Sequence, residues 1–421
     1  MQLTDDHNRT RRLPIRARAA GAISQFLALW KGSASSAEGE HCGTSVARLT
    51  RGGVTAFGIY ISGAGLAYCS QLLIARIVGP DTFGIYAYVL AWMVVLAYFC
   101  ALGFDVALVR FVPAYRAGQA WGLAKGVIQF AERCSMAVGI GVVANGIIAV
   151  EIAEPGISPP LKSTFLAGFM LVPALALLWI RSSAVRAFGG VVSALLPDRL
   201  VRDGALLGLV AFASWGLGWT LDAPWAMKAT LISAGIALGI ASMAKRRLRP
   251  KEFDDIVPEY DAPLWRRTAL PLVILGATES LLNRTGVLLL GWTGHTTEAG
   301  IYGLAFNVAF LATLPLMAVN TVFAPAISDL FARKDQDMFR VLVTTSAFWT
   351  VCGAAPIALV LSVFAGPILN WFGPSYEVGI SALRILLIGH VFAASLGSQL
   401  RVMTMTGHER GAAVLLVAST V

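Results

Sequence analysis

The sequence contains few charged residues. Only 14% of its 421 residues are charged, 57% are hydrophobic, and the mean hydropathy is +0.70. A soluble domain is roughly a quarter charged, so this composition excludes a water-soluble globular protein. The apolar residues form blocks that approach or reach the roughly 20 residues a helix needs to cross a bilayer; examples are 54–75, 86–109, 127–150, 165–180 and 270–290. The composition therefore predicts an all-α polytopic membrane protein.

Cysteine is scarce, and the common catalytic motifs are missing. The five cysteines are an odd number and show no CxxC or Cys/His spacing, and buried free thiols commonly act as small hydrophobes. The chain contains no GxxxxGK[ST], no GxSxG and no HExxH, which are the signatures of ATP hydrolysis, acyl transfer and zinc proteolysis. We therefore expect no disulfide framework, no metal, no cofactor and no enzymatic activity.

The basic residues indicate how the chain is oriented in the membrane. About ten complete spans are expected, with centres near residues 65, 97, 138, 175, 210, 236, 280, 312, 355 and 390. If the N-terminus is cytoplasmic, 27 of the 33 Lys and Arg residues fall in the cytoplasmic segments 1–53, 110–125, 181–202, 245–267, 331–340 and 401–410. This asymmetry follows the positive-inside rule. The net charge of +9 therefore indicates a topology, and a nucleic-acid partner is not expected.

A long polar interruption divides the membrane part after six predicted spans. We expect a basic cytoplasmic tail over 1–53 without stable structure, a first lobe of six spans over 54–244, a cytoplasmic linker over 245–267 and a second lobe over 268–421. About half a span follows Arg410. The second lobe is therefore expected to be incomplete in this chain, with a partial eleventh helix.

Related sequence recurs on either side of the linker. The triplet GIY occurs at 84–86 and at 300–302, an offset of 216, and each copy opens a span. One span later, FVPAY at 111–115 corresponds to FAPAI at 323–327, an offset of 212. Because the paired spans have the same orientation, the repeat predicts two pseudo-symmetric six-helix lobes related by an axis along the membrane normal.

Ionisable residues within spans are the candidate functional residues, because charge inside a bilayer is costly. Glu279 and Asn283 are four residues apart on the seventh span and share a helix face. Arg284 is five residues from Glu279, about 140° around the helix, so a direct salt bridge between them is not expected. Arg284 is then free to face a lumen and bind phosphate with its planar fork. The alternative is a structural pair between Arg284 and another helix.

Two further candidates lie on the tenth span. Arg384 is near the outer end of that span, where the alternative to binding is that its side chain extends to the membrane interface. His390 is near the midplane and can titrate near neutral pH. The alternative for His390 is a core histidine with satisfied hydrogen bonds.

Several motifs resemble those of bacterial polysaccharide-biosynthesis proteins of the oligosaccharide flippase family. In the first half these are ARIVGPDTFGIY at 75–86, LGFD at 102–105 and LVRF at 108–111. In the second half they are GIY at 300–302, PAIS at 325–328, FGPSY at 372–376 and TGH at 406–408. The resemblance covers about residues 50–410. The family belongs to the multidrug/oligosaccharidyl-lipid/polysaccharide exporter superfamily.

This resemblance implies a flippase of the bacterial cytoplasmic membrane. Its substrate would be an undecaprenyl-diphosphate-linked oligosaccharide or polysaccharide precursor, moved by alternating access, and its partners would be membrane lipids, a polysaccharide polymerase and glycosyltransferases. Family members often have Asp near the position of Asn283, so the amide here argues against ion coupling through that residue, and Glu279 is the possible substitute. The alternatives are a multidrug or cation antiporter of the same superfamily and a membrane polysaccharide polymerase or ligase.

Overall fold

The protein is helical throughout the part described by the computed structural model, which comprises residues 43–153, 156–250, 253, 256–317, 319 and 336–396. The first half contains α3 (Gly43–Ala101), α4 (Phe104–Ala117), α5 (Trp121–Ile152), α6 (Pro159–Phe169), α7 (Leu171–Ala187), α8 (Val191–Leu195), η3 (Leu196–Val201), α9 (Arg202–Ala211), η4 (Phe212–Gly216) and α10 (Ala223–Leu248). The second half contains α12 (Ala262–Leu282), α13 (Thr285–Trp292), α14 (Thr296–Ala309), η5 (Phe310–Thr313), α16 (Gln336–Val363), α17 (Ala365–Asn370), η6 (Pro374–Gly379) and α18 (Ile380–Leu396). No strand occurs in these ranges, and the all-α prediction is confirmed.

Seven helices of the described ranges are long and apolar enough to cross a membrane, or eight if the bent pair α12 and α13 is one span. Two features account for the difference from the ten expected spans. The first two spans form one helical run, Ile61–Ala117, which is kinked at Gly79 (φ 76°), where the following Pro80 removes a backbone donor. The fifth span is built from the short elements α8, η3, α9 and η4.

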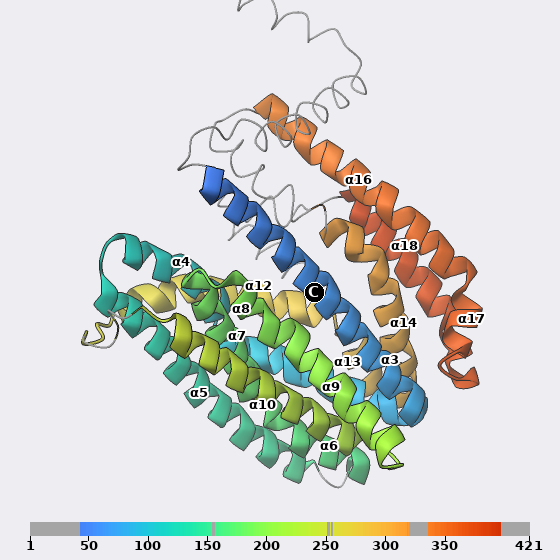
Figure 1. The fold of residues 1–421 in the computed structure, drawn as a ribbon. Helices are drawn as coiled ribbons and strands as arrows, with labels where there is room; N and C mark the ends of the chain where they lie inside the picture. The colour runs from blue at the N-terminus through green and yellow to red at the C-terminus, as the bar shows by residue number, and fades with distance from the viewer. Residues whose placement is uncertain are drawn as a thin grey trace, which may run out of the picture.

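The helices form two lobes (Figure 1). The N-lobe consists of α3 to α10, and the C-lobe consists of α13 to α18. α13 and α14 pack against α3, and α16 and α18 pack against each other. Between the lobes, α12 packs on α3, α4 and α5. Although α12 follows the linker in sequence, it therefore lies against the N-lobe.

The lobes meet at the two copies of the GIY repeat. A Cβ on Gly84 would lie 1.8 Å from the carbonyl oxygen of Thr296, and a Cβ on Gly300 would lie 2.6 Å from the carbonyl oxygen of Pro80. At the repeat offset of 216, Pro80 corresponds to Thr296 and Gly84 to Gly300, so the two contacts are reciprocal. Such self-complementary contacts occur on a two-fold axis. The predicted pseudo-symmetry thus has a physical axis between the two glycines.

A hydrogen bond at the same place also joins equivalent residues. Thr297 Oγ1 donates to Asp81 Oδ1 over 2.6 Å, and these positions too are 216 apart. Nearby, the buried Tyr376 hydroxyl donates to the backbone oxygen of Ala75 over 3.0 Å. We call this end of the molecule the outer end, because the charge pattern predicts that it faces away from the cytoplasm.

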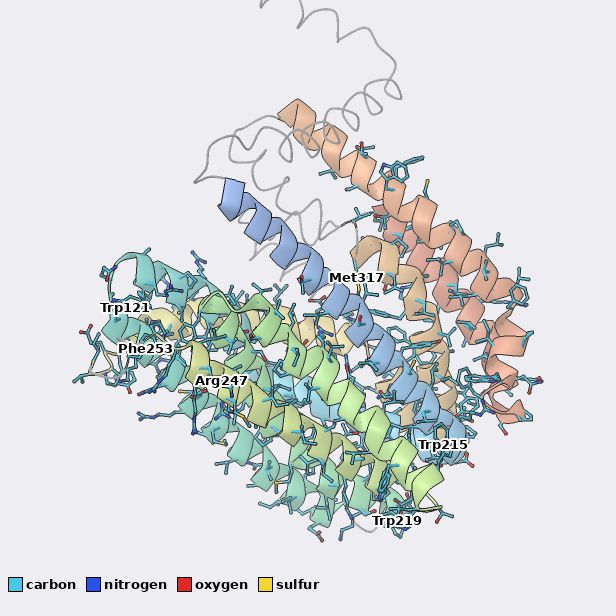
Figure 2. All side chains as sticks on the ribbon, viewed as in Figure 1. Trp121, Trp215, Trp219, Arg247, Phe253 and Met317 are labelled. Carbon is cyan, nitrogen blue, oxygen red and sulfur yellow. The ribbon has the colours of Figure 1, made fainter. Side chains whose placement is uncertain are left out.

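Aromatic residues lie at both ends of the N-lobe. Trp215 and Trp219 are exposed at one end, and Trp121 and Phe253 lie at the other (Figure 2). Tryptophan is enriched at membrane–water interfaces. Phe253 is buried against Phe188 and Trp121. The described part of the linker is therefore packed on the N-lobe.

Backbone contacts also attach the linker to α5. Lys125 Nζ donates to the carbonyl oxygens of Phe253 and Ile256 over 2.5 and 2.8 Å, and Glu259 N–H donates to the Gly122 oxygen over 3.0 Å. Asp261 then caps the start of α12 by accepting from the backbone N–H of Leu264. These contacts place the beginning of α12 at the cytoplasmic end of the N-lobe.

Three helices of the N-lobe are joined by one carboxylate. Glu132 Oε1 on α5 accepts from Arg181 Nε on α7 over 3.1 Å and from Lys245 Nζ on α10 over 2.6 Å. All three side chains are at most 25% exposed. Removing one member of a partly buried ion cluster leaves the others uncompensated, which is more costly than losing a surface pair.

Glu132→Gln is expected to lower the free energy of unfolding by about 1–3 kcal/mol, because Arg181 and Lys245 then lose their shared carboxylate. Thermal unfolding of the purified protein in detergent measures this change. The matched control is Glu151→Gln, which removes a carboxylate that is 49% exposed in its pair with Lys162. Equal melting temperatures for the two variants would contradict a structural role for Glu132.

Several expectations fall on residues outside the described ranges. These are the tail up to residue 42, the second-half motifs at 323–328 and 406–408, and the partial eleventh helix beyond residue 396. The lobe boundaries at 54, 245 and 268 remain predictions.

Candidate functional site

The seventh span is broken at the residues that the sequence singled out. α12 ends at Leu282, α13 begins at Thr285, and the two helices are bent by 66°. Asn283 and Arg284 form the break. Because α12 packs on the N-lobe and α13 on α14, Arg284 lies where the chain passes from one lobe to the other.

The side chain of Arg284 has no ion pair or hydrogen bond to any residue that the structure describes. Its side chain is half-buried, and the ionisable groups within electrostatic range are Tyr98 and Arg202. Tyr98 belongs to α3, and its ring centroid is 4.5 Å from that of Trp179. The predicted absence of a salt bridge between Glu279 and Arg284 agrees with this arrangement. Arg284 is thus an uncompensated positive charge at the lobe junction.

Glu279 and Asn283 are both exposed on the last turn of α12. Glu279 is also within electrostatic range of Tyr98, so it lies near Arg284 without pairing with it. Ser280, one turn before Arg284, is buried and its hydroxyl has no hydrogen-bond partner in the described part of the chain. The break therefore presents a guanidinium, a carboxylate and an amide within two helical turns.

The other two sequence candidates lie in the C-lobe and make no described contact with Arg284. The ring of His390 packs beside Phe306 and Phe310, with centroids 5.9 and 6.5 Å away, and its buried Nε2 has no partner in the described residues. Arg384 is exposed, and its Nε donates to the Ser362 backbone oxygen over 3.4 Å. The unpartnered Nε2 does not fit the alternative of a histidine with satisfied hydrogen bonds, and a role of either residue in binding remains a prediction.

An ion cluster on the fifth span was missed by the sequence analysis. Arg202 donates to Asp198 over 2.8 Å and to Asp203 over 3.1 Å, and Asp203 is buried. Arg199 pairs with Asp198 over 3.6 Å. The charge pattern predicts a cytoplasmic position for Arg199 and Arg202, whereas in the structure Arg202 lies close to the middle of the helical run 191–216. The spacing of Asp198 and Arg202, four residues apart, was the available signal for a helical ion pair.

A buried tyrosine connects this cluster to neighbouring helices. The Tyr86 hydroxyl is 3.0 Å from Thr230 Oγ1 and 3.4 Å from Gln71 Nε2, and it is within electrostatic range of Arg202 and Asp203. The formal charges of the two acidic and two basic side chains of the cluster sum to zero. The cluster therefore links neighbouring parts of the N-lobe as a charge-balanced set, whereas Arg284 has no described carboxylate partner.

The described residues contain no group of three or more His, Cys, Asp or Glu side chains that could hold a metal ion. The arrangement at the helix break therefore offers binding through charge and hydrogen bonds. A guanidinium without a protein partner is suited to a phosphate or carboxylate of a ligand, because its planar fork donates two parallel hydrogen bonds.

Comparison with protein families gives one match in each half. Residues 49–195 match the family described as Polysaccharide biosynthesis protein, and residues 271–420 match the MatE family. A comparison with curated proteins gave no match.

Comparison with solved structures gives MATE transporters. An inward-facing multidrug resistance MATE family transporter of the MOP superfamily is 14% identical, with a TM-score of 0.70 and 87% of each chain covered. An outward-facing structure of such a transporter has a TM-score of 0.62 at 14% identity, covering 86% of this chain and 84% of that one. A mutant MATE transporter from Vibrio cholerae is 17% identical, with a TM-score of 0.56 and 87% of each chain covered.

These matches confirm the resemblance and the two-lobed fold inferred from the sequence. The relatives are transporters of the multi-pass membrane class, whose structures include both inward-facing and outward-facing conformations. Residues 49–195 thus match the polysaccharide biosynthesis protein family, and the chain has the two-lobed fold of the MATE transporters.

Proposed function

We propose that the protein is a flippase that moves an undecaprenyl-diphosphate-linked oligosaccharide or polysaccharide precursor across the bacterial cytoplasmic membrane by alternating access. The observation that carries the proposal is the unpaired Arg284 at the break between α12 and α13. The family match of residues 49–195 supports the same substrate class. In this proposal the N-terminus is cytoplasmic, and glycosyltransferases and a polymerase act before and after the translocation.

The chemistry of the substrate explains why a cation at the lobe junction matters. A diphosphate is anionic, and moving it through an apolar medium without compensation is prohibitively costly. Arg284 supplies the compensating charge, because no described carboxylate neutralises it. Arg202 is within electrostatic range, but its own charge is balanced by Asp198 and Asp203.

The neighbouring polar groups suit the sugar part of the substrate. Glu279 and Asn283 are exposed beside Arg284 and can exchange hydrogen bonds with hydroxyl groups. His390 and Arg384 are proposed as secondary substrate contacts along α18.

The second candidate function is export of a cationic drug. It is favoured by the MatE match over residues 271–420 and by the multidrug transporter among the similar structures. A cationic substrate prefers acidic residues in the pathway, and Glu279 is the exposed carboxylate at the helix break. Arg284 lies five residues away and opposes such a substrate, which is why we place the flippase first.

A leaflet assay distinguishes the two functions. The full chain is reconstituted into vesicles that contain a fluorescent undecaprenyl-diphosphate glycan, and the fraction in each leaflet is followed by a membrane-impermeant quencher. Efflux of a cationic dye from matched vesicles provides the comparison. Glycan translocation without dye efflux supports the flippase. Dye efflux without glycan movement would overturn it and favour the antiporter.

A further inference from the structure

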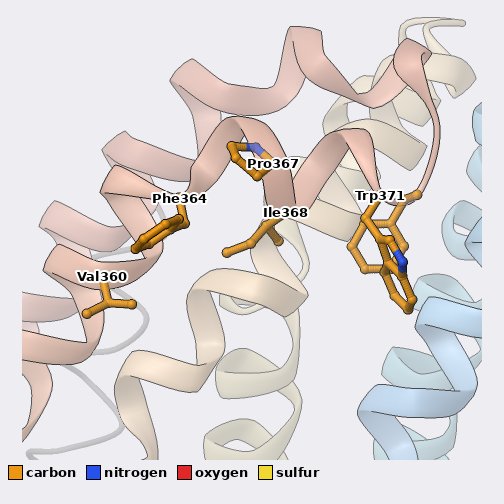
Figure 3. Close-up of a pocket in the computed structure, with 6 residues that line it drawn as sticks. Val360, Phe364, Pro367, Ile368 and Trp371 are labelled. Atoms are coloured by element: carbon orange, nitrogen blue, oxygen red, sulfur yellow. The ribbon is translucent and has the colours of Figure 1, made fainter.

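An apolar groove lies at the outer end of the C-lobe, away from Arg284. It has a volume of about 450 Å³ and is lined by Val360, Phe364, Pro367, Ile368, Trp371 and Phe372. Their side chains follow α16 and α17 along one side (Figure 3). Phe364 and Trp371 are more than half exposed, whereas Phe372 is buried. Exposed apolar side chains on a membrane protein are suited to contact lipid chains.

A fixed cation lies at the rim of this groove. The guanidinium carbon of Arg76 on α3 is 4.6 Å from the centroid of the Trp371 ring, a distance within the range of a cation–π interaction. Tyr376 holds the two elements together, since its hydroxyl donates to the oxygen of Ala75, next to Arg76. The tryptophan ring thus both orients Arg76 and forms one wall of the groove.

The positive charge of Arg76 is available to a ligand. No ion pair with a carboxylate is found for Arg76 within the described ranges. Asp81, five residues further along the chain, instead accepts the hydrogen bond of Thr297. The guanidinium is exposed, so its N–H groups can donate to an anionic oxygen while its face remains on Trp371.

We propose that this groove binds an anionic phospholipid, with the phosphate on Arg76 and an acyl chain along Phe364 and Ile368. Charge complementarity favours an anionic headgroup, because Arg76 at the groove rim is cationic and has no carboxylate partner within the described ranges. The apolar lining selects the chain, since a lipid tail fills a membrane-facing groove at little desolvation cost. The groove belongs to the C-lobe and Arg76 to α3 of the N-lobe, and the site does not depend on which substrate the protein transports.

The proposal is tested by native mass spectrometry of the purified full chain titrated with phosphatidylglycerol or phosphatidylcholine. We expect one phosphatidylglycerol to bind at least about tenfold more tightly than phosphatidylcholine, as a charge-assisted contact to phosphate implies. Arg76→Ala is expected to remove this preference. Lys228→Ala, which removes another exposed cation from the outer half of α10, should preserve it.

Variants of Trp371 distinguish lipid binding at this groove from nonspecific binding of anionic lipid elsewhere on the protein. Trp371→Ala removes both the wall and the support of Arg76, so it should weaken phosphatidylglycerol binding about tenfold. Trp371→Phe keeps an aromatic face and should restore part of the affinity. Equal binding of the two lipids, or a phosphatidylglycerol preference unchanged in Arg76→Ala and Trp371→Ala, would overturn the proposal. So would preferential occupation of the groove by an added undecaprenyl diphosphate.

Discussion

Arg284→Ala is expected to reduce translocation of a lipid-linked glycan by about a hundredfold. Truncating one partner of a buried, hydrogen-bonded charge pair typically costs 2–5 kcal/mol, and the diphosphate would be the partner left without its cation. The leaflet assay described above measures the rate. Arg284→Lys keeps the charge but loses the bidentate fork, so an intermediate loss of about tenfold is expected.

The alternative role of Arg284, a structural pair with another helix, predicts a different pattern. If the guanidinium held two helices together, Arg284→Ala would lower the melting temperature in parallel with transport. Because Arg284 has no described ion pair or hydrogen bond, we expect the melting temperature to stay close to that of the native protein. Unchanged translocation in Arg284→Ala would remove Arg284 from the mechanism.

Apolar length and charge placement were sufficient to predict the helical architecture. Each of the ten predicted span centres lies in a helical segment of the structure, because a bilayer requires every backbone group to be paired within its own helix. The repeat predicted two related lobes, and the structure adds that its two copies meet at Gly84 and Gly300. The repeat is visible in the sequence because both copies need glycine at this close contact.

The helix break at Arg284 was less predictable. The break does not fall at a proline, since Pro271 lies inside α12, twelve residues before Asn283. Neither Asn283 nor Arg284 is a strong helix breaker, and the 66° bend coincides with a change of packing partners, from α3, α4 and α5 for α12 to α14 and α3 for α13. Tertiary contacts of this kind leave no local signal in the sequence.

The ion cluster around Arg202 was missed for a related reason. Residues 198–203 contain four charged side chains, so hydropathy alone predicts a polar loop there. In the structure they pair with each other inside a helix beside Tyr86. Paired charges are buried by neighbouring helices, and the hydropathy of a segment contains no information about its neighbours.

Gly84→Ala is expected to shift the protein towards a conformation that is open at the outer end. The added Cβ would lie 1.8 Å from the Thr296 carbonyl oxygen, and this oxygen belongs to helix backbone that cannot move alone. Overpacking of this kind typically costs 1–3 kcal/mol, which corresponds to a change of about 5- to 150-fold in the ratio of closed to open forms. Because alternating access requires both forms, the rate of translocation should fall as well.

The reciprocal geometry provides the sharpest control. Gly300→Ala places its Cβ 2.6 Å from the Pro80 oxygen, so it should shift the equilibrium in the same direction as Gly84→Ala. Thr297→Ala removes only the hydrogen bond to Asp81 and should produce a smaller shift of the same sign. Gly235→Ala on α10, where the added Cβ meets no atom within 4 Å, should leave both conformation and transport unchanged.

The shift can be measured as a distance between the lobes. Spin labels at Lys228→Cys in the N-lobe and Glu298→Cys in the C-lobe, in a background without the five native cysteines, report the separation at the outer end. Both positions are exposed, so the labels do not disturb the contact itself. A longer-distance population should grow in Gly84→Ala and Gly300→Ala but not in Gly235→Ala. If Gly84→Ala or Gly300→Ala kept the native label distances and the native rate of translocation, the two glycines would be packing residues only, and the lobes would separate elsewhere.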